Sequence, residues 1–182
     1  MFFKEIIMVK LRNTHILLRA LHPDDLDFLE LVENDESLWH LSDTLQPFSR
    51  QVLKDYFEHS YQDIYEAKQM RLVIALHNQQ PIGFIDLYDL HPKHKRAGLG
   101  VLILEEYQSK GFGREALELM IDYAFKVIDL HQIYVTITDD NGPSLRLFEK
   151  LGFQYVGLKK DWRYNAGNFQ DEYLLQKLNN VH

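Results

Sequence analysis

The spacing of apolar residues predicts a helix in the middle of the chain. From Val101 to Ile128 an apolar run is followed by a glycine-containing loop and then by apolar residues three and four positions apart. The helical apolar positions are Ala116, Leu117, Met120, Ile121, Ala124 and Ile128, and the charged residues between them are Glu115, Glu118, Asp122 and Lys126. This spacing is typical of an amphipathic helix with one buried face. The segment is therefore predicted to be a strand, a loop and a helix.

The part of the chain before this segment shows both helical and strand-like spacing. The predicted elements are a strand at 16–19, a helix beginning at 22–25, an irregular stretch at 33–47, a helix at about 49–65, and strands at 70–77 and 81–90 around a turn at 78–80. The apolar faces of the two helices consist of Leu26, Phe28, Leu29 and Val32, and of Val52, Leu53, Tyr56, Phe57, Tyr61 and Ile64. The two later strands are expected to form a hairpin.

The remaining elements complete a mixed pattern. They are strands at 97–104 and 132–138, a helix opened by Asn141, and strands at 154–160 and 168–177 around a turn at 165–167. Asn141 is a plausible N-cap with Pro143 in the first turn, and Gly152 is a plausible C′ residue with Phe153 packing back. The order is strand, two helices, three strands, helix, strand, helix and two strands, which predicts an α/β domain.

The loop before the central helix is predicted to bind an anion. Gly111 and Gly113 leave backbone amides unshielded by a Cβ atom, while Lys110 and Arg114 add positive charge. Because a helix N-terminus is itself partly positive, phosphate is the simplest ligand. The plainer alternative is a tight loop before an ordinary core helix.

Two known nucleotide-binding motifs were compared with this loop, and neither fits its sequence context. GFGREA matches the dinucleotide fingerprint G-x-G-x-x-A, and Asp139 follows the next strand where an acidic residue could hold a ribose. However, EEYQSK separates the strand from the first glycine, and too little chain follows for the remaining βαβ units. A P-loop needs Gly-Lys-Ser/Thr after the loop, and this sequence lacks it.

Two motifs together resemble the GNAT superfamily of N-acetyltransferases. Gln108, Gly111 and Gly113, in QSKGFG, resemble its pyrophosphate loop, and NGPSLRLFEKLGF resembles its second signature. The resemblance extends from about Leu11 to Leu178. It implies an α/β fold with a mixed, partly antiparallel central sheet of about seven strands and about four flanking helices. The sheet would be splayed between its fourth and fifth strands, with acetyl-CoA in the gap.

Length and composition fit one globular domain. With 182 residues, 46% hydrophobic and 26% charged, the chain suits one domain with a sizeable core, and the resemblance implies that residues 1–182 form a single acetyltransferase domain with 1–10 as an N-terminal extension. No apolar run reaches the roughly 18 residues of a membrane helix, and MFFKEIIMVK is too short and charged for a signal peptide, so we expect a cytoplasmic protein. The net charge of −7 argues against nucleic acid, and zero cysteines exclude a cysteine nucleophile.

The resemblance assigns three groups of residues to acetyl-CoA. The backbone amides of Gln108, Ser109, Lys110, Gly111, Phe112, Gly113 and Arg114 would hold the diphosphate, and Val101, Leu102 and Ile103 would pair with the pantetheine arm. Asn141, Ser144, Phe148 and Lys150 would lie along the far side of the cofactor. Each has a plainer alternative: Asn141 is equally an N-cap, Ser144 a first-turn residue, and Lys150 a solvated charge near a helix C-terminus.

The expected proton donor is missing from the second signature. The family's usual general acid is a tyrosine, and the matching residue is Phe148. Tyr164 is a weak substitute, and no acid is assigned. A primary amine with a pKa of about 10.4 is neutral to only about one part in 2,500 at pH 7, a cost of roughly 4 to 5 kcal/mol, so a base or acidic pocket is also expected.

The nearest resemblance within the superfamily is to the spermidine and diamine N-acetyltransferases. It rests on IDLYDLHPKHKRAGLGVLI and WRYNAGNFQDEYLL, and it implies that Asp86 and Asp89 meet the polyamine; outward-facing surface charge is the alternative. The sequence departs from that subfamily at Gly98, where an acidic residue is expected. It departs again at Leu45 and Gln46, which replace an acidic pair.

Other possibilities remain open at this stage. The acceptor could instead be a protein N-terminus, whose pKa near 7.7 to 8 demands less of a base, or the protein could bind acetyl-CoA without catalysis. His91 and His94 with Asp89 could suggest a metal site. Neighbouring lysine and arginine residues repel cations, so no metal is expected. The basic loop could instead contact the cofactor's 3′-phosphate. The sequence leaves open whether the protein forms a homo-oligomer.

Overall fold

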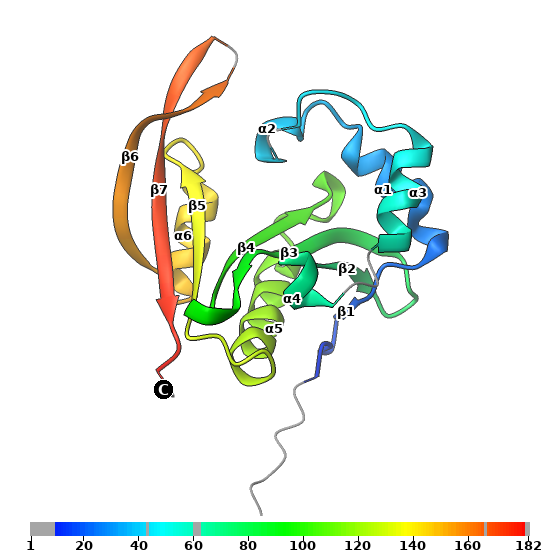
Figure 1. Cartoon of the computed structure of the whole chain (residues 1–182), viewed down its shortest axis with the longest axis horizontal. Coiled ribbons are helices and arrows are strands. Elements are labelled where there is room, and N and C mark those ends of the chain that lie inside the picture. The colour runs from blue at the N-terminus through cyan, green and yellow to red at the C-terminus, as the bar shows by residue number, and fades with distance from the viewer. Residues whose placement is uncertain (1–9, 43, 60–62, 166, 181–182) are drawn as a thin grey trace, which may run out of the picture.

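The protein is built on one mixed β-sheet. The computed structural model describes residues 10–42, 44–59, 63–165 and 167–180 (Figure 1). The strands are β1 (Ile16–Arg19), β2 (Met70–Leu76), β3 (Pro81–His91), β4 (Arg96–Ile103), β5 (Gln132–Thr138), β6 (Gln154–Asn165) and β7 (Asn168–Leu178). Their spatial order is β1-β2-β3-β4-β5-β7-β6, and β4 and β5 are the parallel neighbours in an otherwise antiparallel sheet. The predicted fold class is confirmed.

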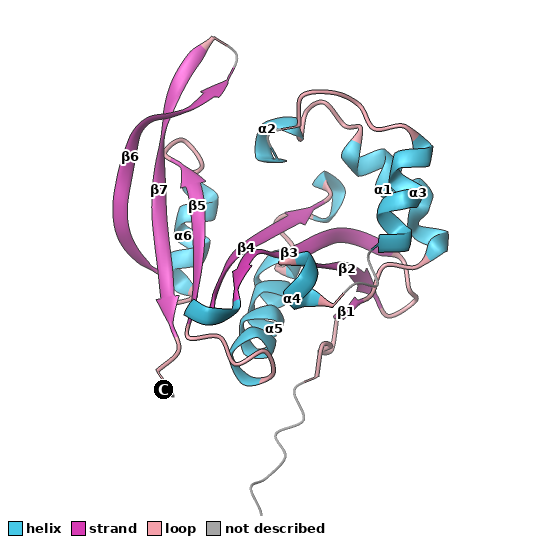
Figure 2. Cartoon of the chain, viewed as in Figure 1, coloured by secondary structure: helices cyan, strands magenta, loops and turns pink. Residues whose placement is uncertain are grey.

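Helices cover both faces of this sheet (Figure 2). They are α1 (Leu26–Glu33), α2 (Trp39–Ser42), α3 (Arg50–His59), α4 (Ile64–Ala67), α5 (Phe112–Lys126) and α6 (Gly142–Lys150). The buried side chains of α5 and α6 share one core with the sheet, while those of α1 and α3 share a second core with Val73, Ala75 and Phe84. Side chains of one strand therefore alternate between two different cores.

The structure divides the predicted helix 49–65 into two. α3 ends at His59, and α4 starts after Asp63, whose extended backbone (φ −56°, ψ 136°) and side chain cap a new helix through the N–H group of Tyr65. Apolar spacing continued across this break, which is why one helix was predicted; Tyr61 lies outside the described residues.

Three other element boundaries differ from the prediction. The stretch predicted to be irregular contains the short helix α2, and Ile128 lies beyond the end of α5. Strand β6 continues to Asn165 because it pairs with β7 along almost its whole length, although most of its residues are exposed.

Strands β4 and β5 separate after a short parallel contact. Their pairs are Arg96↔Gln132, Ala97↔Ile133 and Gly98↔Tyr134, whereas residues 99–103 of β4 pair with β3 alone. On the other side, residues 135–138 of β5 pair with β7. The predicted splay between the fourth and fifth strands is therefore present, with its closed end at Gly98.

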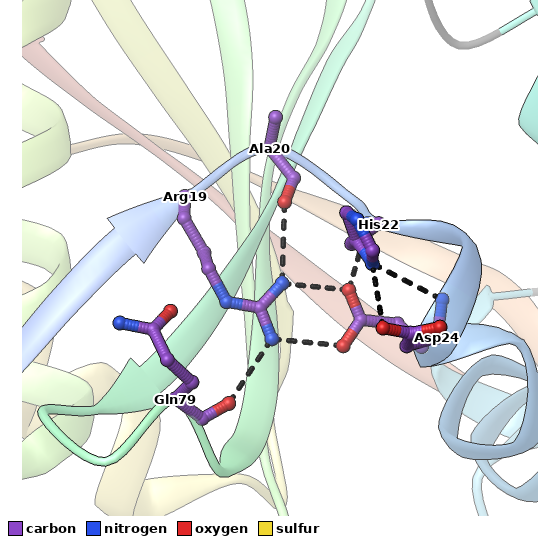
Figure 3. A network of polar contacts seen from close by, with 6 residues as sticks. Arg19, Ala20, His22, Asp24 and Gln79 are labelled. Carbon is purple, nitrogen blue, oxygen red and sulfur yellow. Dashed lines mark hydrogen bonds and ion pairs between the residues drawn. The ribbon is translucent and has the colours of Figure 1, made fainter.

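A buried ion pair fixes the start of the first helical region (Figure 3). Arg19 donates from its guanidinium to both carboxylate oxygens of Asp25, at 2.6 and 2.8 Å, and to the carbonyl oxygen of Gln79. Asp25 also accepts from the backbone N–H of His22, whose imidazole accepts from the N–H of Asp24 in a capping box. Burial opposes ionisation of Asp25, but these hydrogen bonds outweigh it and hold its pKa below the usual range.

Replacing Asp25 with asparagine should change how stability depends on pH. Because the pKa of Asp25 is lower when folded than when unfolded, the wild-type protein gains stability above the unfolded pKa of about 4 and loses it as pH falls through the folded value. Asp25→Asn should lower the free energy of unfolding by about 1 to 2 kcal/mol at pH 7 and flatten the loss between about pH 5 and 3. Urea unfolding at several pH values measures both effects. The exposed Asp24→Asn variant is the control, and an equal acid slope in Asp25→Asn and wild type would contradict the argument.

Candidate active site

Among the residues that the structure describes, no strand pairs with residues 99–103 of β4 on the edge that faces β5. The backbone of Val101, Leu102 and Ile103 faces this opening, and these side chains are partly buried. Gly83 on β3 lies so close to β4 that a Cβ atom there would be 2.1 Å from the carbonyl oxygen of Leu102. The strand is thus held firmly on one side and open on the other, and its open edge can accept an extended ligand as if it were another strand.

A loop at the end of this edge presents the N-terminus of α5. Gly111 is its N-cap and adopts a left-handed conformation with φ of +90°, which favours glycine. The Nε2 group of Gln108 donates to the carbonyl oxygen of Ile103 at 2.9 Å and so ties the loop to the strand. Backbone bonding of the helix begins with the N–H of Glu115 to the carbonyl of Gly111, which leaves the earlier amides at the helix start directed outward. This is the geometry of an anion site.

The two basic residues of the loop are directed along its surface. Lys110 donates to the carbonyl oxygen of Glu106 at 2.7 Å and lies over the ring of Tyr107, and Arg114 pairs with Glu118 one helical turn on. Both stay exposed, so their charge is available near the amides. The positive end of α5 and these cations act in the same direction on an anion.

Helix α6 carries the remaining residues predicted for the cofactor. The side chain of Asn141 accepts from the N–H of Ser144 at 3.2 Å, as an N-cap does. Both residues lie at the start of α6, just after residues 135–138 of β5, which have separated from β4. Lys150 lies at the opposite end of the helix, in a surface groove that also includes Glu118 and Asp122 of α5. The structure therefore brings Asn141 and Ser144 together but places Lys150 apart from them.

Phe148 and Tyr164 occupy very different surroundings. Phe148 is 3% exposed and packs its ring edge to face against Phe153 at 5.0 Å, inside the core shared by α5 and α6. Tyr164 is 68% exposed near the tip of the β6–β7 hairpin, where its ring contacts Phe169. Phe148 thus has no hydroxyl to offer, and Tyr164 lies at the outer end of a hairpin.

An acidic network lies on the sheet face covered by α1 and α3. Arg71 of β2 donates to Asp86 of β3 at 2.7 Å and also pairs with Glu33 at the end of α1. Its guanidinium lies over the rings of Tyr56 and Phe84. One guanidinium meets two acidic side chains, so acidic groups outnumber the cation in this network. The sequence pattern indicates Asp86 but not Glu33 or Arg71, which are distant from it in the chain.

Ionisation in this network follows from burial and pairing. Burial raises the pKa of Asp86 above its usual range even though Arg71 opposes the shift. Burial likewise raises the pKa of Tyr56, which therefore stays protonated at neutral pH.

A second polar group lies at the closed end of the splay. The ring of Tyr88 lies directly over Gly98, where a Cβ atom would be 2.2 Å from the ring, and it meets the ring of Tyr134 edge to face at 5.9 Å. The hydroxyl of Tyr134 donates to Asp89 at 3.2 Å, and Asp89 is exposed at an irregularity in β3. The acidic residue expected at Gly98 is thus replaced by an aromatic ring from the neighbouring strand.

The far wall of this region comes from the closing hairpin. Glu172 of β7 is 4% exposed and pairs with Lys159 and, at 3.7 Å, with Arg163 of β6. Arg163 also donates to the carbonyl oxygen of His40 in α2 at 2.7 Å, so it links the hairpin to the short helix across the open end of the sheet. The sequence pattern does not indicate these three charged residues, since strand alternation alone does not show which charges pair.

The remaining candidates lie at or near the surface. The ring centroids of His91, the partly buried last residue of β3, and of His94, in the loop that follows, lie 4.3 Å apart, and no metal-ligand cluster occurs among the residues that the structure describes. Leu45 and Gln46 are exposed in the connection between α2 and α3. In the described parts of the chain, no helix has the length and apolar character needed to cross a bilayer.

Comparison with known proteins gives one consistent result. Residues 15–154 match the model of an acetyltransferase (GNAT) domain. Spermidine N(1)-acetyltransferase from Vibrio cholerae is 28% identical over 178 residues, which cover 90% of this chain and 95% of that protein. A crystal structure of the V. cholerae spermidine N-acetyltransferase with CoA and spermine has a TM-score of 0.82 at 27% identity, covering 91% of this chain and 96% of that one. A dodecameric structure of the V. cholerae enzyme in an intermediate state has a TM-score of 0.77 at 28% identity, covering 91% and 95%.

Proposed function

The chain belongs to the GNAT acetyltransferase family, and we propose that it transfers acetyl from acetyl-CoA to a primary amine of a small diamine or polyamine such as spermidine. The observation that carries this proposal is the open edge of β4 ending at an anion-binding helix start. An extended arm with a diphosphate at one end fits these two features together. Acetyl-CoA is the co-substrate.

The cofactor assignment follows the direction of the open edge. The diphosphate lies against the amides from Gln108 to Arg114, and the pantetheine arm runs along the backbone of Val101, Leu102 and Ile103 toward Gly98. Asn141 and Ser144 flank the cofactor from the start of α6, which follows the part of β5 that has separated from β4. Phe148 contributes apolar packing beneath them, and Lys150 lies apart from them at the opposite end of α6.

The acceptor assignment uses the acidic side of the same opening. The relative that binds spermine with CoA is a polyamine enzyme, and this chain offers net negative charge near Asp86 and at the exposed Asp89. A polyamine carries several ammonium groups, so one can be held by carboxylates while another, deprotonated, reaches the thioester. Carboxylates at the distal end therefore orient the acceptor without holding the attacking nitrogen in its charged form.

The experiment that tests the function is acetyl-CoA-dependent release of free thiol. Spermidine, a diamine and a short peptide with a free N-terminus are offered separately to the purified chain. Release with spermidine or the diamine is expected. Release with the peptide alone would move the acceptor to a protein N-terminus, and none with any acceptor, despite acetyl-CoA binding, would leave a binding-only protein.

The proposal also covers the domain organisation, the cellular location and the assembly of the protein. We take residues 1–182 as a single acetyltransferase domain and place it in the cytoplasm, which supplies acetyl-CoA. A homo-oligomer is consistent with the dodecameric relative, and the outer strand β6 offers an exposed edge with Val156 and Trp162 at its surface. Gel filtration with light scattering measures the assembly.

A further inference from the structure

The proposed reaction delivers a proton to the departing thiolate, and the position on α6 that usually carries the donor has none. Phe148, at the position where the second signature usually has its tyrosine, is an apolar core residue. Another donor must therefore reach the place where the carbon–sulfur bond breaks. That place follows from the sheet itself, on the premise of the proposed function.

The closed end of the splay fixes where an extended cofactor arm must stop. A ligand paired with the free edge of β4 can run from Ile103 back to residue 99, about 13 Å at roughly 3.3 Å per residue. It cannot continue further, because from Gly98 the backbone of β5 occupies the partner position through Gly98↔Tyr134. With the diphosphate at the Gln108 end, the sulfur and the acetyl group lie at the Gly98 end.

Tyr88 is the residue that crosses this closed end. It pairs with Gly98 in the register of β3 and β4, and its ring lies over that glycine within the space where a side chain would otherwise be. Its Cε1 atom also lies 3.8 Å from the position of a Cβ atom at Gly100. The absence of side chains at both glycines lets a phenol from β3 extend over β4 toward β5.

The hydroxyl end of Tyr88 is directed toward the far strand of the splay. The Tyr88 phenol lies close enough to the side chain of Thr136 on β5 for the two to interact, and Thr136 is two residues beyond the last residue that pairs with β4. The phenol thus spans the opening immediately above its closed end. Burial raises its pKa, so the hydroxyl keeps its proton at the pH values at which more of the amine is neutral.

We propose that Tyr88, from the acceptor face of the sheet, is the proton donor to the sulfur of CoA in this protein. The amine nitrogen attacks the acetyl carbonyl carbon, and the carbon–sulfur bond breaks as the Oη–H of Tyr88 passes its proton to sulfur. The nitrogen of the new amide releases one proton, which returns to the Tyr88 oxygen. The products are the acetylated amine and free CoA thiol, with Tyr88 unchanged.

The other tyrosines on this face are less well placed. The hydroxyl of Tyr134 already donates to Asp89, and Tyr56 lies beneath α3 beside Arg71. Tyr164 lies at the outer end of the hairpin. Tyr88 alone among these four has its ring over the glycines of β4.

The test compares Tyr88→Phe with a matched variant. Tyr88→Phe keeps the ring and removes one oxygen, and we expect kcat to fall about 10²-fold, at the low end for general acid catalysis because a thiolate leaves readily. KM for spermidine and Kd for CoA should change less than twofold. Tyr155→Phe, which removes the same oxygen from the ring that packs against Tyr173 on the outer hairpin, should keep wild-type kcat.

A second measurement keeps the inference testable if Tyr88→Phe is unstable. A fluorinated tyrosine at position 88 has a more acidic phenol, so the alkaline fall of kcat should move to lower pH. An unchanged alkaline limb, or a Tyr88→Phe variant with kcat within threefold of wild type, would overturn the role of Tyr88 while wild-type turnover leaves the proposed function standing. Absence of wild-type turnover with every amine overturns the proposed function first.

Discussion

Arg71→Met is expected to lower the free energy of unfolding by about 2 to 4 kcal/mol at pH 7. The guanidinium pairs with Asp86 and Glu33, and the side chains of all three residues are at most 26% exposed. Removing it takes the cation from over the rings of Tyr56 and Phe84 and leaves two carboxylates unpaired, and an unpaired buried charge costs far more than a lost surface pair. Urea unfolding followed by circular dichroism gives the change.

The loss in free energy of unfolding caused by Arg71→Met should also become smaller in acid. Burial already raises the pKa of Asp86, and without Arg71 it rises further. A carboxyl whose pKa is higher folded than unfolded destabilises the fold above its folded pKa, and this cost disappears as it protonates. The deficit should therefore be largest near pH 8 and smaller near pH 5.

A double variant separates charge from packing at this network. Arg71→Met with Asp86→Asn removes one unpaired carboxylate and should recover part of the loss, whereas Arg50→Met, at an exposed ion pair with Asp27, should cost under about 1 kcal/mol. A deficit that is independent of pH and not reduced by Asp86→Asn would show that lost packing of the long arginine side chain, rather than unpaired charge, is responsible.

Much of the fold could be predicted from local spacing because burial has a period. The central helix and strand β5 have one buried face each, and their residues repeat accordingly. Two segments were predicted incorrectly because their apolar spacing does not follow their structure. The apolar spacing continued through Asp63, where the chain turns, and the outer strand β6 is exposed on both faces and therefore shows no alternation over its full length.

In the candidate site, too, features made by neighbouring residues could be predicted, and contacts between residues distant in sequence could not. The loop around Gly111 is a contiguous motif, and its left-handed glycine, helix start and link to β4 all come from neighbouring residues. By contrast, Glu33 meets Arg71 across 38 positions of sequence, and Glu172 meets Arg163 only because β6 and β7 pair. The alternation in IDLYDL could have shown that Asp86 and Tyr88 share a face, but not that Gly98 leaves room for the ring.

Gly98→Ala should reduce both stability and turnover, through one contact. The new Cβ atom would lie 2.2 to 2.7 Å from three carbon atoms of the Tyr88 ring, so the ring must leave its place over β4. Overpacking of this kind costs about 1 to 3 kcal/mol. If the displaced phenol is the proton donor, kcat should fall about as far as in Tyr88→Phe, on the order of 10²-fold.

The double variant decides whether these two effects have one cause. In Gly98→Ala with Tyr88→Phe, the losses in kcat should not multiply, because the second change removes a hydroxyl that the first has already displaced. Gly100→Ala is the matched control, since its Cβ atom would meet the Tyr88 ring at an ordinary 3.8 Å. Multiplying losses would mean that Gly98 and Tyr88 act separately, and then the glycine serves close approach of the acceptor rather than placement of the phenol.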